Sequence, residues 1–457
     1  MRIVFIGQPR DRFSGTGSEF GSVAIVLRNI ADRIARGAEV HVIAPIGPGE
    51  AAEEVTASGV TVHRVPARGR HLFKAVDLIE GLGAPSVPLF YRRAYYAGFR
   101  KRAVALVARL RPDVVHVMSL PEIARDIDRL HPRPAVMLHL HDEGMLRLPQ
   151  AKVSAWLQAT DRVLTCSSFI ADHLARLHPQ LAGRIRCIGN GVDFSLFDRP
   201  ADSEAQADRP FERILFIGRV SPEKGPHLLV DAFVRLAAAW PGLTLDLVGP
   251  AGLLPWSYVH LIAGDPEMAS ALPFYGHGLA GRLDRQVLHA RTSLVDALRA
   301  RIPAELRERV RLPGSLPQHE LAGLMDTNTL FVQPSLCQEG FGLPLAEAMA
   351  CGLPVVACRR GGITDLVEDG RNGRLVPAGD VDALVHAIDA QLRDPARARA
   401  MGRAAASDIR RRFSWDHVSE RLEREIATLR SEAVHHPRRP RTGSGNCRFW
   451  NPGLGCG

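Results

Sequence analysis

The sequence has no long uncharged apolar segment. A membrane-spanning helix needs about 18–20 consecutive apolar residues, and no such run occurs in the 457 residues of the chain. The opening residues, Met-Arg-Ile-Val-Phe-Ile-Gly, are too short an apolar run for a secretory signal and predict a buried strand. We therefore expect a cytoplasmic protein, with the inner face of the membrane as an alternative location.

Cysteine is scarce, and acidic residues are fewer than basic ones. The seven cysteines form no C-x-x-C pair, whereas a structural zinc site uses four well-spaced ligands, so we expect no metal. Lys and Arg number 58 against 49 Asp and Glu, for a net charge of +9. This balance favours anionic partners such as nucleotide phosphates, lipid or nucleic acid. Because no nucleic-acid-binding module is recognisable, nucleic acid is not an expected partner.

Short apolar runs alternate with helical patterns, which is typical of parallel sheets covered by helices. A helix is predicted at 22–36, and strands at 3–7, 39–44, 113–118, 135–140 and 162–165. After a polar, acidic linker near 200–210, the pattern restarts at Arg213-Ile-Leu-Phe-Ile-Gly-Arg. We predict an α/β protein with two Rossmann-like, doubly wound domains at 1–200 and 211–410. A helix follows at 411–430, and the basic, aperiodic tail at 431–457 is predicted to be disordered.

Two loops carry residues suited to phosphate. Gly15-Thr16-Gly17-Ser18-Glu19-Phe20-Gly21 precedes a predicted helix, whose amides and positive N-terminus attract anions. Its spacing is not the dinucleotide G-x-G-x-x-G, and a flexible loop with a helix cap is the alternative for Gly17 and Gly21. The second loop, after the strand at 213, places Arg219 and Lys224 where two cations suit a diphosphate. The alternative there is a solvated loop.

A third segment combines a glycine loop with two acids. Glu339-Gly340-Phe341-Gly342-Leu343-Pro344 leads into a helix that contains Glu347, and proline suits the first helical turn. Free amides at Gly342 and Leu343 would face an anion. Glu339 and Glu347 can line one cleft, where carboxylates make strong hydrogen bonds to a hydroxyl-rich ligand.

This segment resembles the GT-B-fold retaining glycosyltransferases of family four (glycosyl transferases group 1). Glu339 and Glu347 have that family's E-x-seven-E spacing, and EGFGLPLAEAMACGLPVVA, GGITDLVEDGRNGRLVPAGD and FIGRVSPEKG match its core closely. The similarity spans about residues 1–430 and is weak over 45–110 and 250–309. It implies two domains facing across a cleft, an N-terminal acceptor side, a C-terminal nucleotide-sugar side, and a helix at 411–430 that crosses back to the first domain.

The resemblance also implies roles for individual residues. Glu339 would bind hydroxyls of the donor sugar, and Glu347 the ribose. Arg219 and Lys224 would hold the diphosphate and stabilise the leaving group, with the loop formed by Gly340, Phe341, Gly342 and Leu343 beside it. The expected reaction uses no cofactor or metal and transfers a sugar from a UDP- or GDP-sugar with retention. Its acceptor hydroxyl would belong to a glycan, a lipid-linked glycan or a small-molecule natural product.

His141, within His139-Leu140-His141-Asp142-Glu143, matches the family's active-site histidine near the sugar. The alternative is a structural histidine. Because side chains alternate along a strand, His139 is predicted to face the core. Asp142 and Glu143 are candidate acceptor contacts.

Other functional classes share parts of this pattern. A NAD-dependent oxidoreductase needs a tight G-x-G-x-x-G that is not present. A GT-B-fold epimerase or phosphorylase, or a non-catalytic sugar-binding protein, would share the architecture. Metal-dependent transferases use D-x-D motifs, and the matches at Asp126-Ile127-Asp128 and Asp380-Val381-Asp382 fall in helical patterns, where we interpret them as solvated.

The segment 91–111 is rich in arginine and aromatic residues. A basic amphipathic helix of this kind can lie on anionic lipid, which would make peripheral membrane contact, or it can bind an acidic acceptor. The alternative is a charged surface helix whose aromatic residues pack into the core.

Overall fold

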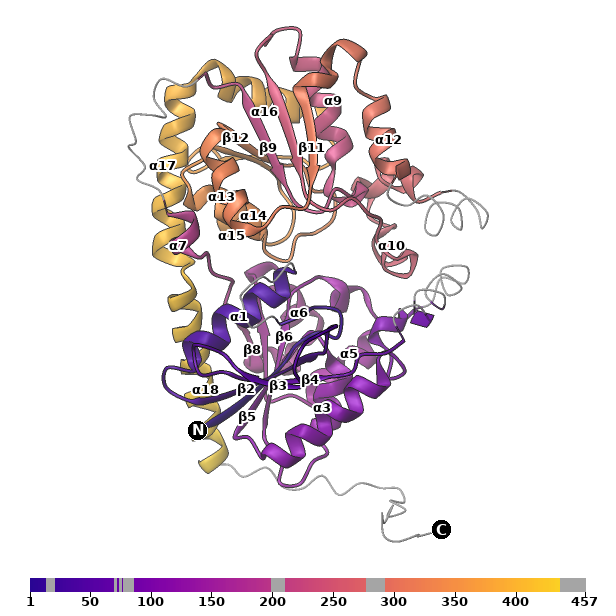
Figure 1. The fold of residues 1–457 in the computed structure, drawn as a ribbon, viewed down its shortest axis with the longest axis vertical. Helices are drawn as coiled ribbons and strands as arrows, with labels where there is room; N and C mark the ends of the chain where they lie inside the picture. Colours follow the sequence, from indigo (N-terminus) through magenta and orange to yellow (C-terminus); the bar gives the residue numbers. More distant parts are fainter. Residues whose placement is uncertain are drawn as a thin grey trace.

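The computed structural model describes residues 1–13, 21–69, 86–198, 210–276 and 292–435, together with positions 72, 73 and 76. The chain forms two α/β domains, one above the other in Figure 1. Each is built on its own sheet, of eight and six strands among the described residues. This arrangement confirms the predicted fold class of two Rossmann-like domains.

The N-terminal sheet has the strand order β3-β4-β2-β1-β5-β6-β7-β8. Its central strands β1, β5, β6 and β7 are mostly apolar and buried along almost their whole length, as expected for strands covered on both faces. Its long helix α1 buries residues at helical spacing, from Ala24 to Ile34. The strands are β1 (Arg2–Ile6), β2 (Glu39–Pro45), β3 (Glu53–Val55), β4 (Thr61–Val65), β5 (Val114–Met118), β6 (Ala135–Leu140), β7 (Arg162–Thr165) and β8 (Ile185–Cys187). The helices are α1 (Ser22–Ile34), α3 (Ala97–Leu110), α4 (Pro121–Ile127), α5 (Gln150–Gln158), α6 (Ser168–Leu177) and α7 (Phe194–Phe197).

One edge of this sheet departs from the prediction of parallel strands. Strand β3 pairs with β4 in the antiparallel direction. The short strand β3 carries Glu53 and Glu54 and is not buried, so it has no apolar run by which the sequence pattern could reveal it. An antiparallel edge strand on an otherwise parallel sheet is a common variation of this fold.

The C-terminal sheet has the strand order β11-β10-β9-β12-β13-β14, and all its pairs are parallel. The order reverses between β9 and β12, so the loops after these two strands meet at the point where ligands bind in open α/β sheets. The strands are β9 (Arg213–Ile217), β10 (Thr244–Val248), β11 (Val310–Gly314), β12 (Leu330–Gln333), β13 (Val355–Cys358) and β14 (Arg374–Val376). The helices are α9 (Pro226–Leu236), α10 (Trp256–Ile262), α12 (Thr292–Ala300), α13 (Gln318–Thr327), α14 (Leu343–Ala350), α15 (Ile363–Leu366) and α16 (Val381–Arg393).

Two long helices join the domains along one side of the molecule (Figure 1). Helix α17 (Pro395–Arg412) packs on α14 of the second domain, and α18 (Trp415–His435) packs on α1 of the first. At the crossing, the amide of Val192 donates to the carbonyl of Phe413 at 2.8 Å. Helix α18 extends to His435, five residues into the segment predicted to be disordered, while 436–457 lie outside the described residues.

Most aromatic residues of segment 91–111 face inward, and Tyr95 is partly exposed. Tyr91, Tyr96 and Phe99 are buried, whereas Arg93, Lys101 and other basic residues are exposed. An amphipathic helix on lipid would need these rings on its outer face. These three rings are therefore not available to lipid, and contact of this segment with an anionic membrane stays a prediction. Of the helices that the structure describes, none is both long and apolar enough to span a bilayer.

A buried ion pair holds α18 on the first domain. The Arg162 side chain is only 3% exposed, and its guanidinium lies 2.9 Å from Glu425 and 3.1 Å from Glu432. Removing Glu425 would leave a buried cation with only one acidic partner. We expect Glu425→Ala to lower the free energy of unfolding by roughly 3 kcal/mol, measured by denaturant titration.

The matched control is Glu423→Ala, because Glu423 is exposed on the same helix. A change at Glu423 is expected to stay within about 0.5 kcal/mol. Equal stabilities for the two variants would show that α18 docks through its apolar face alone.

Candidate functional site

Two loops of the second domain meet at its topological switch point. The loop after β9 carries Lys224, and the loop after β12 carries Glu339. Lys224 Nζ donates to both oxygens of Glu339, at 2.7 and 2.8 Å, and the hydroxyl of Ser335 donates to the same carboxylate at 2.5 Å. Two residues that lie 115 positions apart in the sequence are thus locked together.

The Lys224–Glu339 pair stays charged in spite of its burial. Burial would raise the pKa of Glu339, but the charge of Lys224 and hydrogen bonds from Lys224, Ser335 and Gln333 outweigh burial, so the pKa is lowered. Burial would lower the pKa of Lys224, yet Cys337 and Glu339 raise it overall. The site therefore holds a fixed cation beside a fixed anion at neutral pH.

Arg219 is positioned by a buried acid that the sequence analysis did not single out. Glu223 is fully buried, and its carboxylate accepts from Arg219 at 2.8 Å, from Ser221 at 2.6 Å and from Tyr275 at 2.5 Å. Tyr275 ends the short 3-10 helix Leu272–Tyr275, within the segment 250–309 that the sequence pattern left unassigned. The sequence shows Glu223 within the loop that carries Arg219 and Lys224. It does not show that Tyr275, about 50 residues later, donates a hydrogen bond to Glu223.

The second acid of the E-x-seven-E pattern lies on α14. Glu347 is 6% exposed, and Gln318 Nε2 lies 3.5 Å from its carboxylate. Burial raises the pKa of Glu347 to about 8. At the start of α14, Gly342 is the N-cap with φ +98°, a conformation that favours glycine. The first-turn amides of this helix have no intrahelical partners and can face an anion.

Not every residue of the predicted donor loop presents its side chain to the site. The Phe341 ring is buried against Phe413, with the ring centroids 5.6 Å apart, and Leu343 is buried as well. Only their backbone atoms are available to a ligand. Gly21 is the N-cap of α1, and the side chain of Asp11 fills the space beside it. Gly17 lies outside the described residues.

His141 reaches the site from the first domain. It follows β6, and its carbonyl lies so close to Gly340 that a Cβ at Gly340 would collide with it. The Cys166 thiol also donates to the Gly340 carbonyl at 3.3 Å. The His141 ring contacts the His139 ring at a tilt, with a centroid distance of 4.0 Å, and His139 is fully buried, as predicted. Because burial lowers the pKa of His141 to about 3, its imidazole is neutral at physiological pH.

The two acids after His141 also lie in the cleft between the domains. Asp142 accepts from the Tyr91 hydroxyl at 3.2 Å and from the Gly144 amide at 2.8 Å. Glu143 pairs with Arg147 at 3.0 Å. Burial raises the pKa of each of these carboxyl groups.

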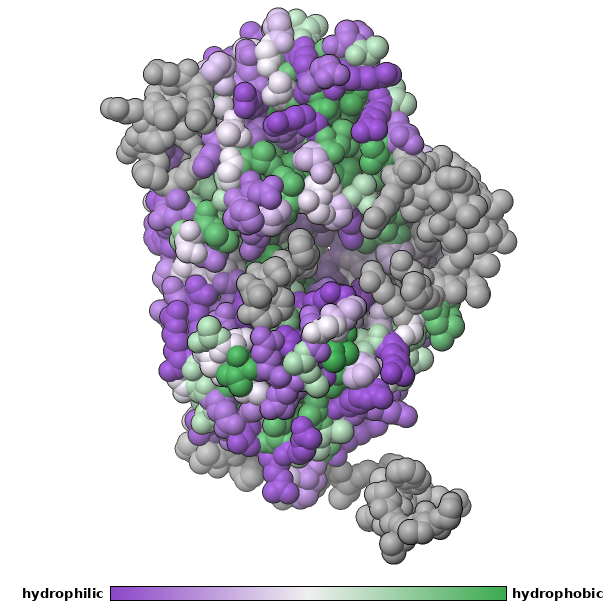
Figure 2. All heavy atoms as spheres, in the orientation of Figure 1, coloured by the Kyte–Doolittle hydropathy of each residue, from purple (hydrophilic) through white to green (hydrophobic). Residues whose placement is uncertain are grey.

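Residues that the sequence analysis missed bridge the cleft directly. Arg147 donates to Asp265 of the second domain at 3.1 Å, and Asp265 also accepts from Arg360 at 2.5 Å. On the other side, the Ser168 amide donates to Asp365 at 2.6 Å. The face drawn in Figure 2 shows the hollow that remains between the two domains.

The D-x-D matches have structural partners. Asp126 forms ion pairs with Arg93 and Arg100, and Asp128 pairs with Arg133 at 2.8 Å. Asp380 caps α16 by accepting from the Ala383 amide at 2.8 Å, and Asp382 pairs with an arginine of α9. These carboxylates therefore form ion pairs or cap a helix within the fold.

The raised pKa of Glu347 predicts a pH-dependent stability. The carboxyl keeps its proton in the folded chain up to about pH 8, whereas its ordinary pKa is 4.5. Unfolding above about pH 4.5 therefore releases a proton, so this group destabilises the fold progressively as the pH rises toward 8. We expect the melting temperature of Glu347→Gln, relative to the native chain, to rise between about pH 5 and pH 8.

Glu305→Gln is the control, because Glu305 is exposed, and its difference from the native chain should be independent of pH. A constant difference for Glu347→Gln as well would mean that Glu347 is already ionised in the fold.

Comparisons with known proteins agree with this geometry. Residues 23–196 match the family model described as Glycosyltransferase Family 4, and residues 297–408 match Glycosyl transferases group 1. The D-inositol 3-phosphate glycosyltransferase of Streptomyces avermitilis is 32% identical over 312 residues, which are 66% of this chain and 59% of that protein. The glycogen synthase of Mycobacterium tuberculosis is 28% identical over 357 residues, which cover 75% of this chain and 76% of that protein.

Solved structures share the two-domain framework. The sucrose-phosphate synthase of Thermosynechococcus elongatus superimposes with a TM-score of 0.68 at 22% identity, covering 94% of this chain and 99% of that one. The Anabaena protein HepE, solved with UDP and glucose, superimposes with a TM-score of 0.64 at 20% identity, covering 93% and 99%. Each domain of the chain thus carries its own family match on a shared GT-B framework, and the chain belongs to the GT-B-fold glycosyltransferases of family four.

Proposed function

We propose that this protein transfers a sugar from a nucleoside diphosphate, UDP or GDP, to an acceptor hydroxyl with retention of configuration and without a metal ion. The observation that carries the proposal is the fixed pairing of Arg219 with Glu223 and of Lys224 with Glu339 at the switch point of the second domain, with the buried Glu347 on the helix α14 that follows. The sugar–nucleotide complexes of HepE, a structural neighbour, support the same ligand class.

The two cations of this site, Arg219 and Lys224, are suited to stabilising the charge that develops when the bond between the sugar and the nucleotide breaks. As the bond between the sugar C1 and the diphosphate oxygen breaks, negative charge develops on the departing phosphate, and preorganised cations stabilise it. Arg219 is held by Glu223 and Lys224 by Glu339, so neither cation has to reorganise during the reaction. The acceptor oxygen bonds to C1, and its proton passes to an oxygen of the departing phosphate. The first-turn amides of α14 add to the stabilisation.

The acids and the histidine bind the donor rather than act as an acid–base pair. Glu339 accepts hydrogen bonds from donor-sugar hydroxyls, and Glu347 from the ribose. His141 lies across the cleft as a neutral imidazole, so it contributes a hydrogen bond to the sugar and no charge. Closure of the cleft excludes water and protects the donor from hydrolysis.

Donor binding tests the proposal first. Melting temperature and donor turnover are measured with a panel of UDP-, GDP- and ADP-sugars, for the native chain and for Lys224→Ala and Glu339→Ala. Hydrogen bonds to charged groups contribute about 1.5–3 kcal/mol each, so each variant should lose roughly 10- to 100-fold in affinity for the preferred donor.

Lys101→Ala and Glu305→Ala are matched controls, because both residues are exposed and far from the cluster. Failure of the native chain to bind any nucleotide sugar would overturn the donor-site assignment. Proton NMR of the product anomer tests retention, and release of a free epimerised sugar without acceptor would indicate the epimerase alternative.

Tyr275 is predicted to act through Arg219. Removing its hydroxyl leaves the fully buried Glu223 with one donor fewer and loosens the carboxylate that holds Arg219. We expect Tyr275→Phe to lower kcat about tenfold, corresponding to one net hydrogen bond of about 1–1.5 kcal/mol, with the acceptor KM unchanged. A variant with native kcat would show that Tyr275 only stabilises the segment around it.

A further inference from the structure

A cavity lies at the outer edge of the first sheet, between helix α3 and the edge strands β3 and β4. Its volume is about 450 Å³, which is within the range of small-molecule sites. Helix α3 packs beside β4, and Figure 1 shows the two elements next to each other. The donor site proposed above is built on the second sheet, so this cavity is a separate feature of the molecule.

The wall formed by α3 carries two arginines at its ends. Arg102, Ala105, Leu106 and Arg109 line the cavity at helical spacing. Arg102 donates to the carbonyl of Gly98 in its own helix at 3.3 Å, and neither arginine forms an ion pair with an acid in the described part of the chain. A rise of 1.5 Å per residue separates the two arginine positions by about 10 Å along the helix.

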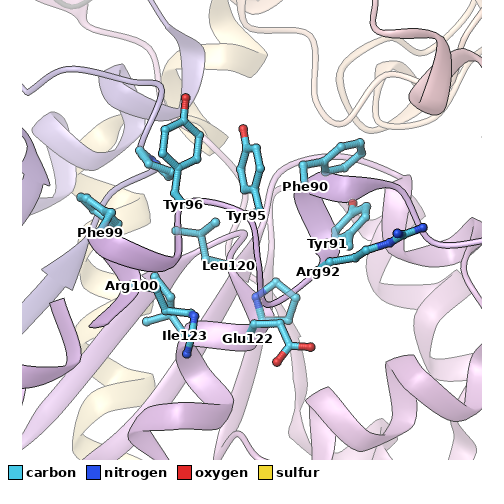
Figure 3. Close-up of a pocket in the computed structure, with 12 residues that line it drawn as sticks. Phe90, Tyr91, Arg92, Tyr95, Tyr96, Phe99, Arg100, Leu120, Glu122 and Ile123 are labelled. Atoms are coloured by element: carbon cyan, nitrogen blue, oxygen red, sulfur yellow. The ribbon is translucent and has the colours of Figure 1, made fainter. Parts of the chain in front are cut away.

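Other basic residues nearby are used by the fold. Arg100 forms an ion pair with Asp126 of α4, and Figure 3 shows Arg100 beside Ile123 of the same helix. The guanidinium of Arg64, which borders the cavity, pairs with Glu54 at 2.6 Å. The two arginines of the α3 wall are exposed and have no such role. Cations that face one cavity without an acid between them attract an anion there.

The opposite wall holds a chain of two buried histidines between two carboxylates. His63 of β4 lines the cavity, and its Nδ1 lies 3.2 Å from Glu53 of β3. Its Nε2 lies 3.0 Å from Nδ1 of His41 on β2, whose Nε2 lies 3.0 Å from Glu39. His41 and His63 are only 7% and 6% exposed. At the far end of the chain, Arg2 of β1 pairs with Glu39 at 2.9 Å.

The three contacts of this chain need three protons. A neutral imidazole carries one proton on its two ring nitrogens, so two neutral rings supply only two. One contact would then bring two lone pairs together. A third proton satisfies every contact and gives the histidine pair one positive charge. The wall opposite α3 is therefore cationic when all its hydrogen bonds are made.

The charges around His63 oppose this third proton in the absence of a ligand. Burial lowers the pKa of His63, and the charges of His41 and Arg109 act in the same direction, while Glu53 raises the pKa. An anion between Arg109 and His63 would offset the repulsion between the two cations. Binding of an anion and uptake of a proton therefore favour each other.

We propose that this cavity binds a ligand that carries two phosphate groups, one held by Arg102 and one by Arg109, and that binding adds a proton to the pair of His41 and His63. A guanidinium donates two parallel hydrogen bonds to phosphate, which suits each arginine to one phosphate group. The small and apolar side chains between the arginines leave room for a compact linker. The proposal does not depend on the transferase function, because none of these residues belongs to the donor site.

Titration calorimetry of the full chain tests the site with fructose 1,6-bisphosphate and with inorganic phosphate as probes. The bisphosphate should bind at least about tenfold more tightly, because it engages both arginines. Phosphate also suits the cations of the donor site, so the titration is repeated with Lys224→Ala. Binding of the bisphosphate at the cavity should persist in that variant.

Variants of the α3 wall locate the binding. Arg102→Gln and Arg109→Gln should each weaken bisphosphate binding about tenfold, the loss of one charge-assisted contact. Lys101→Gln is the matched control, because Lys101 is exposed on the same helix and lies outside the cavity. All three residues are at the surface, and the melting temperature without ligand checks that each variant is folded.

His63→Gln tests the shared proton. The ratio of native to His63→Gln affinity for the bisphosphate should rise as the pH falls from 8 to 6.5, because only the native pair gains a proton. The ionisation of the probe is common to both chains and cancels in this ratio. A ratio that does not change with pH would overturn the coupling to the histidine pair.

A second arm distinguishes a soluble ligand from a lipid headgroup. Phosphatidylcholine vesicles that contain cardiolipin, a lipid with two phosphates, are sedimented with the native chain and with the two arginine variants. Sedimentation that both variants abolish, without binding of the soluble probe, would assign the same phosphate chemistry to a lipid. Absence of binding in both arms, or equal binding by the native chain and both arginine variants, would overturn the site.

Discussion

The buried ion pair between Lys224 and Glu339 is the interaction on which the candidate site depends. It ties the loop after β9 to the loop after β12 across the switch point of the second sheet. Because Glu339 is buried and Lys224 only partly exposed, loss of Lys224 would leave an uncompensated buried charge on Glu339. The same pairing keeps the cation in place before any phosphate arrives. The entropy lost in ordering the Lys224 side chain is therefore lost when the chain folds and not when the ligand binds.

The sequence predicts most of the strands and helices because each depends on the pattern of apolar residues within its own segment. Strands such as β6 and β7 have the bounds that their apolar runs predict, and the acids of the E-x-seven-E pattern lie on the loop and helix expected for them. Strand β3 escaped prediction because its residues are polar and its pairing is set by β4. The extent of α18 escaped as well, since its last turn lies within a composition typical of disorder.

Contacts between distant segments were beyond the reach of sequence patterns. The carboxylate of Glu223 was visible as a residue of a phosphate-type loop, but its bond to Tyr275 depends on how the segment after β10 folds back. The same holds for Arg147, Asp265 and Arg360, which come from three separate parts of the chain. No periodicity links such residues, because their proximity results from packing. In this fold the segment that the family resemblance covers least supplies contacts to both sides of the cleft.

The path of the chain between the domains sets how they can move. The chain passes from one domain to the other near Val192 and returns near Phe413, and these two crossings are bonded side by side. Because the two crossings are bonded to each other, sliding one domain past the other would break that bond, whereas rotation about the line of the crossings would leave it intact. Such a rotation would instead separate the contacts on the far side of this line, among them the bridge from Arg147 to Asp265.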